Sequence, residues 1–293
     1  MGTTWRVLAV SPRPVAALRK AIDAAIADVV VQMSHWDATS HLSRFNAAPV
    51  GTPTPIPADF ATVLQCALNV AAASGGAFDP AAGHLVDRWG FGPPGPVATP
   101  PTDAQLAAHP RPAAPHLRLD GATLTRTADV RLDLSGIAKG FGVDAVWRAL
   151  AALGIDDALM EIGGELRGEG IRPDGQPWWV DLETPRGDPA TPLRVALHGL
   201  SVATSGDYVR HWTHDGRRYA HTLDPRTGRP VDNGVIAVSV LAADAMAADA
   251  WATALHVLGP AGMSLAATRG LAVRMLIRDG ELLSPALAAM LDG

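Results

Sequence analysis

The second half of the chain is dominated by short strand patterns that follow one another directly. ALMEIGGELRGEG, WWVDLETP, LRVALHGLSVATSG and YAHTLDP each combine β-branched or aromatic residues with tight-turn glycines and prolines, and VIAVSVLAA at 235–243 reads as another strand. Strands joined by hairpins pair antiparallel, whereas a parallel sheet needs a helix between consecutive strands. The sequence therefore predicts an α+β fold with antiparallel sheets and packed helices.

Apolar residues at helical spacing predict a small number of long helices. They cover about 14–32, 58–73, 137–153 and 244–258, with glycine stops after the last three. A strand is expected at 4–10 and a hairpin at 116–133, turning at Asp120-Gly121. The proline-rich loop 91–104 is too short to be a domain linker. We expect a single domain over residues 1–293.

Composition excludes several classes of protein. The net charge is −5 and acids and bases are mixed along the chain, so there is no clustered basic face for nucleic acid. No apolar run approaches the roughly 20 residues that a membrane helix needs. The N-terminus lacks a basic region followed by an apolar stretch, so we expect a cytoplasmic protein, or an exported one if a leader has been removed. The single cysteine, Cys66, allows no internal disulfide.

Asp249 and Thr253 lie four residues apart in ADAWATAL, on a predicted helix. That spacing puts both side chains on one face. A carboxylate and a hydroxyl are hard oxygen ligands, which suit magnesium better than zinc. The alternative is structural: a favourable acid near a helix start and a threonine bonded back to its own helix.

The stretch DLSGIAKG at 133–140 has the features of an anion site. We expect Asp133 to end a strand, Gly136 to lie at the turn into a helix and Lys139 to lie in the first helical turn. Backbone amides at a helix start bind phosphate, and a lysine there adds positive charge. The alternative is that the glycines only permit close packing and that Lys139 is solvated.

These elements, taken with MGTTW at 1–5, TSGDY at 204–208 and HTLDPRTG at 221–228, resemble the ApbE family of flavin transferases. The resemblance runs from residue 1 to about 260 and implies a T-fold-like architecture. It also implies magnesium-dependent transfer of FMN from FAD to a threonine hydroxyl of an acceptor flavoprotein. The implied metal ligands are Asp249, Thr253 and the backbone carbonyl of Gly136.

The resemblance further implies where FAD is bound. Met1 corresponds to a flavin-contacting methionine, Trp36 to an aromatic position, and Ala77, Phe78 and Asp79 in GAFDP to a cofactor-contacting turn. Asp133, Lys139 and His221 are the other implied FAD contacts. His84 stands where the family usually has a small residue or proline.

His221, Asp249 and Lys139 are the expected catalytic residues, although His221 and Asp133 both remain candidates for the general base. Two other functions use the same residues: an FAD pyrophosphatase that gives FMN and AMP, and a non-catalytic flavin-binding protein. We expect a monomer or a homodimer, with no nucleic-acid partner and no membrane span.

Overall fold

The computed structural model describes residues 2–185, 192–208 and 210–292, and the chain divides into two compact units. Unit 1 comprises 1–29, 137–206 and 234–293, and unit 2 comprises 30–136 and 207–233. Met1, one of the expected flavin contacts, lies outside the described residues. Whether the two units form a single domain stays a prediction.

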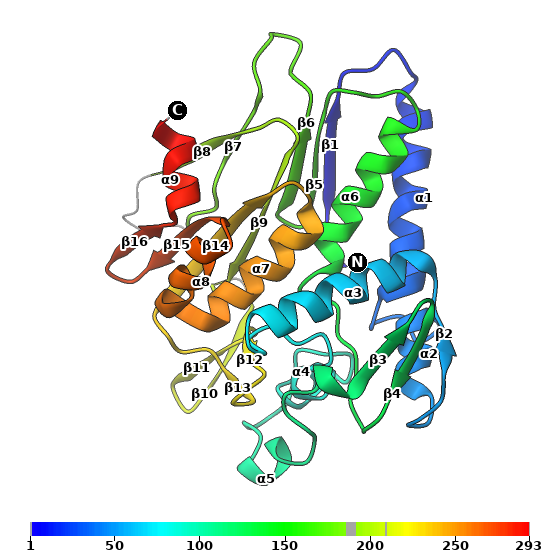
Figure 1. Ribbon diagram of the computed structural model, residues 1–293, viewed down its shortest axis with the longest axis vertical. Helices are drawn as coiled ribbons and strands as arrows, with labels where there is room; N and C mark the ends of the chain where they lie inside the picture. Colours follow the sequence, from blue (N-terminus) through cyan, green and yellow to red (C-terminus); the bar gives the residue numbers. More distant parts are fainter. Residues whose placement is uncertain (1, 186–191, 209, 293) are drawn as a thin grey trace. The chain divides into compact units, whose positions relative to one another are not determined.

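Unit 1 is built on a seven-stranded antiparallel sheet in the order β1-β5-β6-β9-β14-β15-β16 (Figure 1). Its strands are β1 (Trp5–Ala9), β5 (Ala158–Ile162), β6 (Glu165–Glu169), β9 (Leu200–Gly206), β14 (Val235–Ala242), β15 (Ala272–Ile277) and β16 (Gly280–Leu283). A separate hairpin pairs β7 (Trp178–Asp181) with β8 (Arg194–Leu197).

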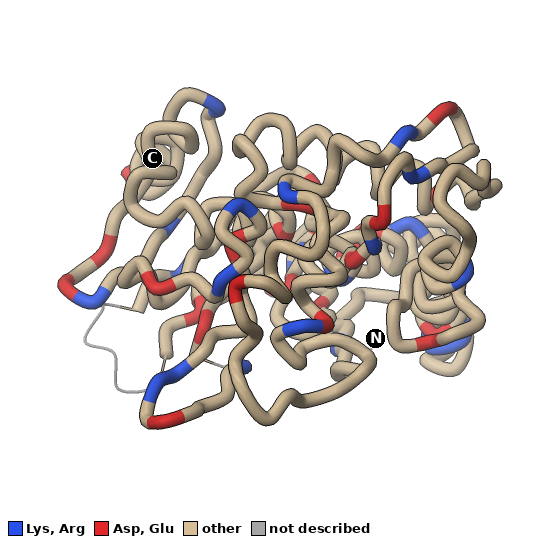
Figure 2. Tube along the Cα trace, turned by 90° about the horizontal axis from the view of Figure 1, so that it is seen from below, with Lys and Arg blue, Asp and Glu red and all other residues tan. Residues whose placement is uncertain are grey.

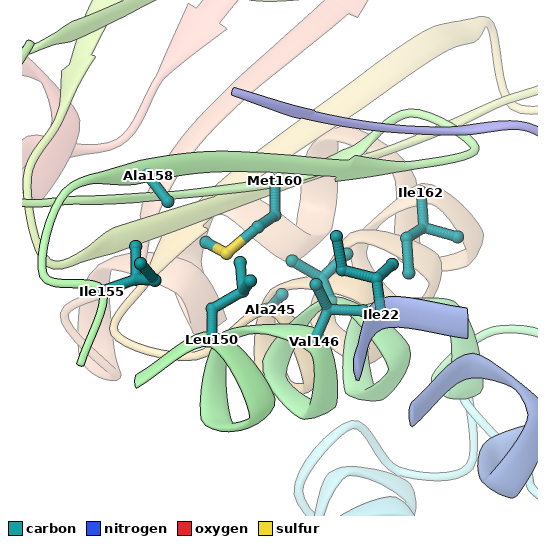
Figure 3. Close-up of a cluster of buried hydrophobic side chains, with 9 residues drawn as sticks. Ile22, Val146, Leu150, Ile155, Ala158, Met160, Ile162 and Ala245 are labelled. Carbon is teal, nitrogen blue, oxygen red and sulfur yellow. The ribbon is translucent and has the colours of Figure 1, made fainter. Parts of the chain in front are cut away.

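Helices α6 (Ala138–Ala151) and α7 (Ala245–Leu258) pack against each other and against the strands of this sheet. Figure 3 shows Val146 and Leu150 of α6 among the side chains around Met160 of β5 and Ile22 of α1 (Val15–Met33). A second cluster packs Trp178 and Leu197 of the hairpin with Leu287 of α9 (Pro285–Asp292). The remaining helices of unit 1 are η2 (Gly259–Ala261) and α8 (Gly262–Thr268).

Unit 2 consists of shorter elements. Its helices are α2 (His41–Ala47), α3 (Ala58–Ala73), α4 (Gly83–Arg88), α5 (Asp103–Leu106) and η1 (Ala114–His116). Its strands are β2 (Thr54–Pro55), β3 (Leu117–Asp120), β4 (Thr123–Arg126), β10 (His211–His214), β11 (Arg217–Ala220), β12 (Leu223–Asp224) and β13 (Arg229–Pro230). Trp89 is buried in an apolar cluster with Leu85, Leu106 and Leu223, so the predicted core position of this tryptophan is confirmed.

The α+β prediction is confirmed by these helices and antiparallel sheets, and the four long helices lie within two residues of their predicted bounds. Short helices also form where none was expected: α2, α4 and α9. In addition, α5 begins inside the expected loop 91–104. The expectation that Asp133 ends a strand is wrong: only an isolated bridge between Ala82 and Arg131 forms there.

Charged residues of both signs are interspersed along the described chain (Figure 2). Within the same residues, no helix is long and apolar enough to cross a membrane.

Candidate functional site

Asp249 lies inside α7, where its carboxylate reaches the start of α6. Asp244 caps α7 by accepting from the Ala247 N–H at 2.7 Å, so Asp249 stands beyond the first turn and is not needed as a cap. Its Oδ2 accepts a hydrogen bond of 3.0 Å from the Gly140 N–H. Thr253 is half-buried one turn further along the same face of α7. Asp249 is therefore not a first-turn acid of α7, and its role as a metal ligand stays a prediction.

The close approach of the two helices requires a glycine at position 140. A Cβ atom added there would lie 2.1 Å from the Ala245 carbonyl oxygen and 2.9 Å from the Asp249 Cβ. The second glycine of DLSGIAKG therefore permits the helix packing that brings the Asp249 carboxylate to the first turn of α6.

Lys139 pairs with Glu165, the first residue of β6. The Gly163-Gly164 turn positions Glu165: both glycines have positive φ, and Ile162 and Glu165 face each other directly across the hairpin. The Glu165 side chain is almost completely buried, whereas the Lys139 side chain is one-third exposed. Lys139 is therefore not simply solvated.

Three charged groups perturb one another here. Burial and the charge of Asp249 raise the pKa of Glu165 to about 8, against the opposing effect of Lys139. Burial also raises the pKa of Asp249, although Lys139 and the Gly140 N–H favour its charged form. Burial alone would lower the pKa of Lys139, but Asp249 and Glu165 raise it above its usual range. One ammonium group thus faces two buried carboxyl groups, and the raised pKa of Glu165 favours its protonated form at neutral pH.

This donor set fits a hard divalent cation. Among the described residues, the buried Oε2 atom of Glu165 has no hydrogen-bond partner. The cluster also contains the Asp249 carboxylate, with the Thr253 hydroxyl on the same helical face, and oxygen ligands are those that magnesium prefers. A cation bound there would favour the charged forms of both carboxyl groups, whose pKa values are raised mainly by burial.

A buried ion pair holds the start of α7 in place. The Asp144 carboxylate on α6 accepts from the Ala245 and Met246 N–H groups at 3.1 and 2.9 Å. Arg167 on β6 donates to the same carboxylate at 2.7 Å and also pairs with Glu169. This network ties α6, β6 and α7 together next to the Lys139 cluster.

In unit 2, Asp133 is held by two neighbours. Its Oδ1 accepts from the Ser135 N–H at 2.7 Å and lies 3.5 Å from His35 Nδ1. Burial works to raise the pKa of Asp133, but the bonds from His35 and Ser135 hold it below its usual range. Burial likewise opposes protonation of His35, yet Asp133 raises the pKa of this histidine. The Asp133 backbone N–H donates to Pro80 at 2.9 Å, next to the GAFDP turn.

The GAFDP turn offers backbone atoms more than side chains. Ala77 and Phe78 have buried side chains, and Asp79 is also buried. The Asp79 carboxylate accepts from the Ala81, Ala113 and Ala114 N–H groups at 2.7–3.1 Å. Burial raises the pKa of Asp79 despite these three bonds. Asp79 therefore fixes the shape of the turn, while any ligand contact by Ala77 or Phe78 must come mainly from their main chain.

His221 is half-buried and its ring meets Phe91 edge-on at 6.2 Å between centroids. Its Nδ1 lies 3.1 Å from the Arg210 carbonyl oxygen. A carbonyl only accepts, so Nδ1 carries the proton and Nε2 is the basic nitrogen. The following turn is fixed by Trp89, whose Nε1 donates to the Gly228 carbonyl at 2.8 Å.

The expected site residues fall into two groups. Lys139, Asp249 and Thr253 belong to unit 1, and the structure brings Lys139 and Asp249 together. The other described site residues belong to unit 2: Trp36, Ala77, Phe78, Asp79, Asp133, Gly136 and His221. Trp36 is 57% exposed and Gly136 is half-buried. An exposed indole is free to stack on a flat ligand ring.

Sequence reasoning missed Glu165, His35 and Asn46. Glu165 follows a Gly-Gly turn between two strand patterns, and alternation along β6 would have put this acid on a defined face. His35 stands directly before Trp36 and carries no signal of its own. Asn46 pins the strand-like segment before Asp133 by exchanging two hydrogen bonds with Leu132, at 2.8 and 2.9 Å. Its partner is far away in the sequence and could not be predicted.

Comparisons with known proteins identify the family to which the chain belongs. The model of the ApbE family matches residues 1–275. The FAD:protein FMN transferase of Vibrio cholerae serotype O1 is 38% identical over 288 residues, which are 96% of this chain and 86% of that protein. The enzyme of the same name from Haemophilus influenzae is 38% identical over 292 residues, 95% of this chain and 84% of that protein.

Solved structures show the same relationship. The apo crystal structure of Pseudomonas stutzeri flavinyl transferase ApbE has a TM-score of 0.91 at 36% identity, covering 100% of this chain and 95% of that one. The ApbE protein of Thermotoga maritima has a TM-score of 0.88 at 27% identity, covering 99% and 96%. The predicted resemblance is confirmed over nearly the whole chain. The chain belongs to the ApbE family.

Proposed function

We propose that this protein transfers FMN from FAD to an acceptor flavoprotein and releases AMP. Relatives that cover almost the whole chain carry the name FAD:protein FMN transferase. The observation that carries the proposal is the cluster of Lys139, Glu165 and Asp249. It combines a cation with two buried carboxyl groups of raised pKa at the start of a helix.

Asp249 and Thr253 are the proposed side-chain ligands of Mg²⁺, and the carbonyl of Gly136 is the third protein ligand implied by the family resemblance. The metal would supply Lewis-acid neutralisation of the diphosphate charge. Glu165 lies in the same cluster and accepts from Lys139, so it orients this ammonium group. Lys139 then contributes positive charge to the anionic diphosphate of FAD.

In the proposed reaction, a threonine hydroxyl of the acceptor attacks the phosphorus on the FMN side of the diphosphate. A phosphoester bond forms, the bond to the bridging oxygen breaks, and AMP leaves with the electron pair. Anionic oxygens shield that phosphorus, so positive charge placed beside them lowers the barrier. Holding both reactants in line replaces a costly encounter in solution.

The general base of this reaction is assigned to His221. The hydroxyl proton must be removed as the bond to phosphorus forms, and a His221 whose Nδ1 donates to the Arg210 carbonyl offers Nε2 as the proton acceptor. Asp133 is the weaker candidate, because its lowered pKa and its bonds to His35 and Ser135 make it a poor proton acceptor. Asp133, with Trp36 and the Ala77–Asp79 turn, is proposed to bind FAD, as is Met1 by resemblance.

Product analysis separates this function from its alternatives. The protein is incubated with FAD, Mg²⁺ and an acceptor flavoprotein, with an EDTA control, and the acceptor is weighed by intact-mass spectrometry. The transferase predicts a gain of one FMN on the acceptor, lost with EDTA and lost when the target threonine is replaced by alanine. Accumulation of free FMN and AMP with an unmodified acceptor would instead identify an FAD pyrophosphatase. Intact FAD, unaffected by chelator, would identify a flavin-binding protein.

The cellular location and the oligomeric state of the protein are two further proposals. We propose a cytoplasmic protein that acts as a monomer or a homodimer. Fractionation of cells that produce the full-length protein, and light scattering of the purified chain, measure these two properties directly.

A further inference from the structure

Two histidines and an aspartate from three separate segments of unit 2 lie together. None of the three is among the residues proposed to bind FAD or Mg²⁺. His84 is on α4, His109 is in the segment between α5 and η1, and Asp129 follows β4. His84 Nε2 lies 3.3 Å from Asp129 Oδ1, and His109 Nδ1 lies 3.5 Å from Asp129 Oδ2. Each carboxylate oxygen thus faces one imidazole nitrogen.

The two imidazole rings are stacked, with 3.7 Å between centroids and 2° between planes. One potential ligand atom from each of the three residues lies within 4.8 Å of the other two. Tetrahedral ligands at 2.0–2.1 Å from a zinc ion are about 3.3 Å apart. Side-chain rotations that take the two rings out of their parallel stack would turn the ring nitrogens toward a common point and bring the three atoms to bonding distance.

The same three residues line a cavity. Its volume is about 10 Å³, and Asp79, Arg111 and Pro225 contribute to its walls. A volume of this size is roughly that of one water-sized sphere. The cavity could hold one ion, or a water molecule as the fourth ligand of an ion bound by the three side chains.

The charges around the cluster suit a metal that prefers nitrogen. Burial lowers the pKa of His84, and the neighbouring His109 lowers it further, although Asp129 acts to raise it. Arg126 lies 3.7 Å from Asp129 Oδ1, but its guanidinium donates to the Val130 and Ala48 carbonyls. Arg131 also faces His84 and pairs with Asp87 at 3.3 Å. The positive charges of Arg126 and Arg131 lower the affinity of the cluster for a metal ion, but neither arginine is one of the proposed ligands.

We propose that His84, His109 and Asp129 form a second metal site, specific for a borderline transition-metal dication such as Zn²⁺. Two imidazoles and one carboxylate match zinc, whereas magnesium takes oxygen ligands. The bound ion ties α4 to the segments around 109 and 129. It therefore stabilises unit 2.

Cobalt binding tests the site directly, because Co²⁺ with nitrogen ligands absorbs visible light. The full-length protein is titrated with Co²⁺ in millimolar Mg²⁺, which fills oxygen-only sites, and Zn²⁺ is then added to displace the cobalt. We expect one equivalent of coloured Co²⁺, displaced by Zn²⁺, and a higher unfolding midpoint with zinc. His84→Ala and His109→Ala should each weaken binding by at least tenfold.

His214→Ala is the matched control, because His214 pairs with Asp215 at 3.3 Å and this pair belongs to no three-residue cluster found among the described residues. It should bind cobalt as the wild type does. His84→Gln keeps a hydrogen-bond donor for Asp129 and guards against simple unfolding, which circular dichroism would detect. The proposal would be overturned if the wild type formed no coloured Co²⁺ complex. It would also be overturned if His84→Gln and His109→Ala bound Co²⁺ as tightly as the wild type does. The three residues would then be only a hydrogen-bonded His–Asp–His group.

Discussion

The Oδ2 atom of Asp249 accepts a 3.0 Å hydrogen bond from the backbone N–H of Gly140, although the two residues are 109 positions apart. This bond joins the middle of α7 to the first turn of α6. It places the proposed metal ligand next to Lys139, whose ammonium group acts on the Asp249 carboxyl. The proposed chemistry of the site depends on this contact between the two helices.

Gly140→Ala should disrupt that contact. The new methyl group would overlap the Ala245 carbonyl oxygen, so α6 and α7 must separate or distort. We expect a loss of about 1–3 kcal/mol in the free energy of unfolding, the usual cost of overpacking a core. Urea unfolding measures this loss. The control is Ala151→Ser at the exposed end of the same helix, and equal stability of the two variants would contradict the packing argument.

Lys139→Ala should weaken FAD binding by roughly tenfold or more, since hydrogen bonds to charged groups contribute about 1.5–3 kcal/mol. Removing the ammonium also removes the charge that lowers the pKa of Glu165. A flavin fluorescence titration measures the affinity. Lys20→Ala, at an exposed position of α1, is the control. An unchanged titration for Lys139→Ala would remove this lysine from the site.

The His35–Asp133 pair should make stability depend on pH. Asp133 has a lowered pKa in the folded state, so its contribution is present above its unfolded pKa and is lost as the pH falls through the folded value. His35 has a raised pKa, so its contribution is present below about pH 6.5 and is lost as the pH rises through the folded value. The pair therefore stabilises the fold most at about pH 4–6.5.

We expect His35→Gln to lose on the order of 1 kcal/mol in the free energy of unfolding relative to the wild type near pH 6, the scale of one typical intramolecular hydrogen bond. The difference should shrink as the pH rises toward 9. Thermal unfolding at a series of pH values measures it, with His198→Gln as an exposed control. A difference that stays constant with pH would show that His35 contributes packing and no charge.

Asp144→Ala should destabilise unit 1 by about 3 kcal/mol, because it leaves Arg167 buried beside an incomplete network and removes two bonds from the start of α7. Asp181→Ala is the matched comparison: it also breaks a close pair with arginine, Arg194, but both partners are exposed. Its unfolding midpoint should stay close to that of the wild type. Equal losses of stability in Asp144→Ala and Asp181→Ala would contradict the argument that the Asp144 pair stabilises the protein more because it is buried.

Local sequence patterns predicted much of this fold and part of the site. Apolar residues at helical spacing predicted α1, α3, α6 and α7. The α+β fold class was predicted from strands that succeed one another without intervening helices. The i, i+4 spacing placed Asp249 and Thr253 on one helical face. Family motifs, and not periodicity, supplied the assignments of FAD and magnesium, and these roles stay predictions for each residue.

The parts that were missed depend on contacts between distant segments. Burial of Glu165 requires α6 and α7 to cover β6, and the position of Asp133 requires Asn46 to hold Leu132 across 86 residues. The expected strand before Asp133 does not form, because its segment is fixed by side-chain bonds in place of a ladder. The short α2 depends on Ser40, which caps it by accepting from the Ser43 N–H.

The most direct test of the account is the rate of acceptor modification by Asp249→Asn, followed by intact mass in the presence of FAD and Mg²⁺. The asparagine keeps an oxygen that can accept from the Gly140 N–H but removes the charge that would bind the cation. We predict a folded protein whose transfer rate is lower by roughly 100-fold or more, the scale of losing one electrostatic stabiliser. Transfer at a near-normal rate would contradict the assignment of Asp249 to the metal.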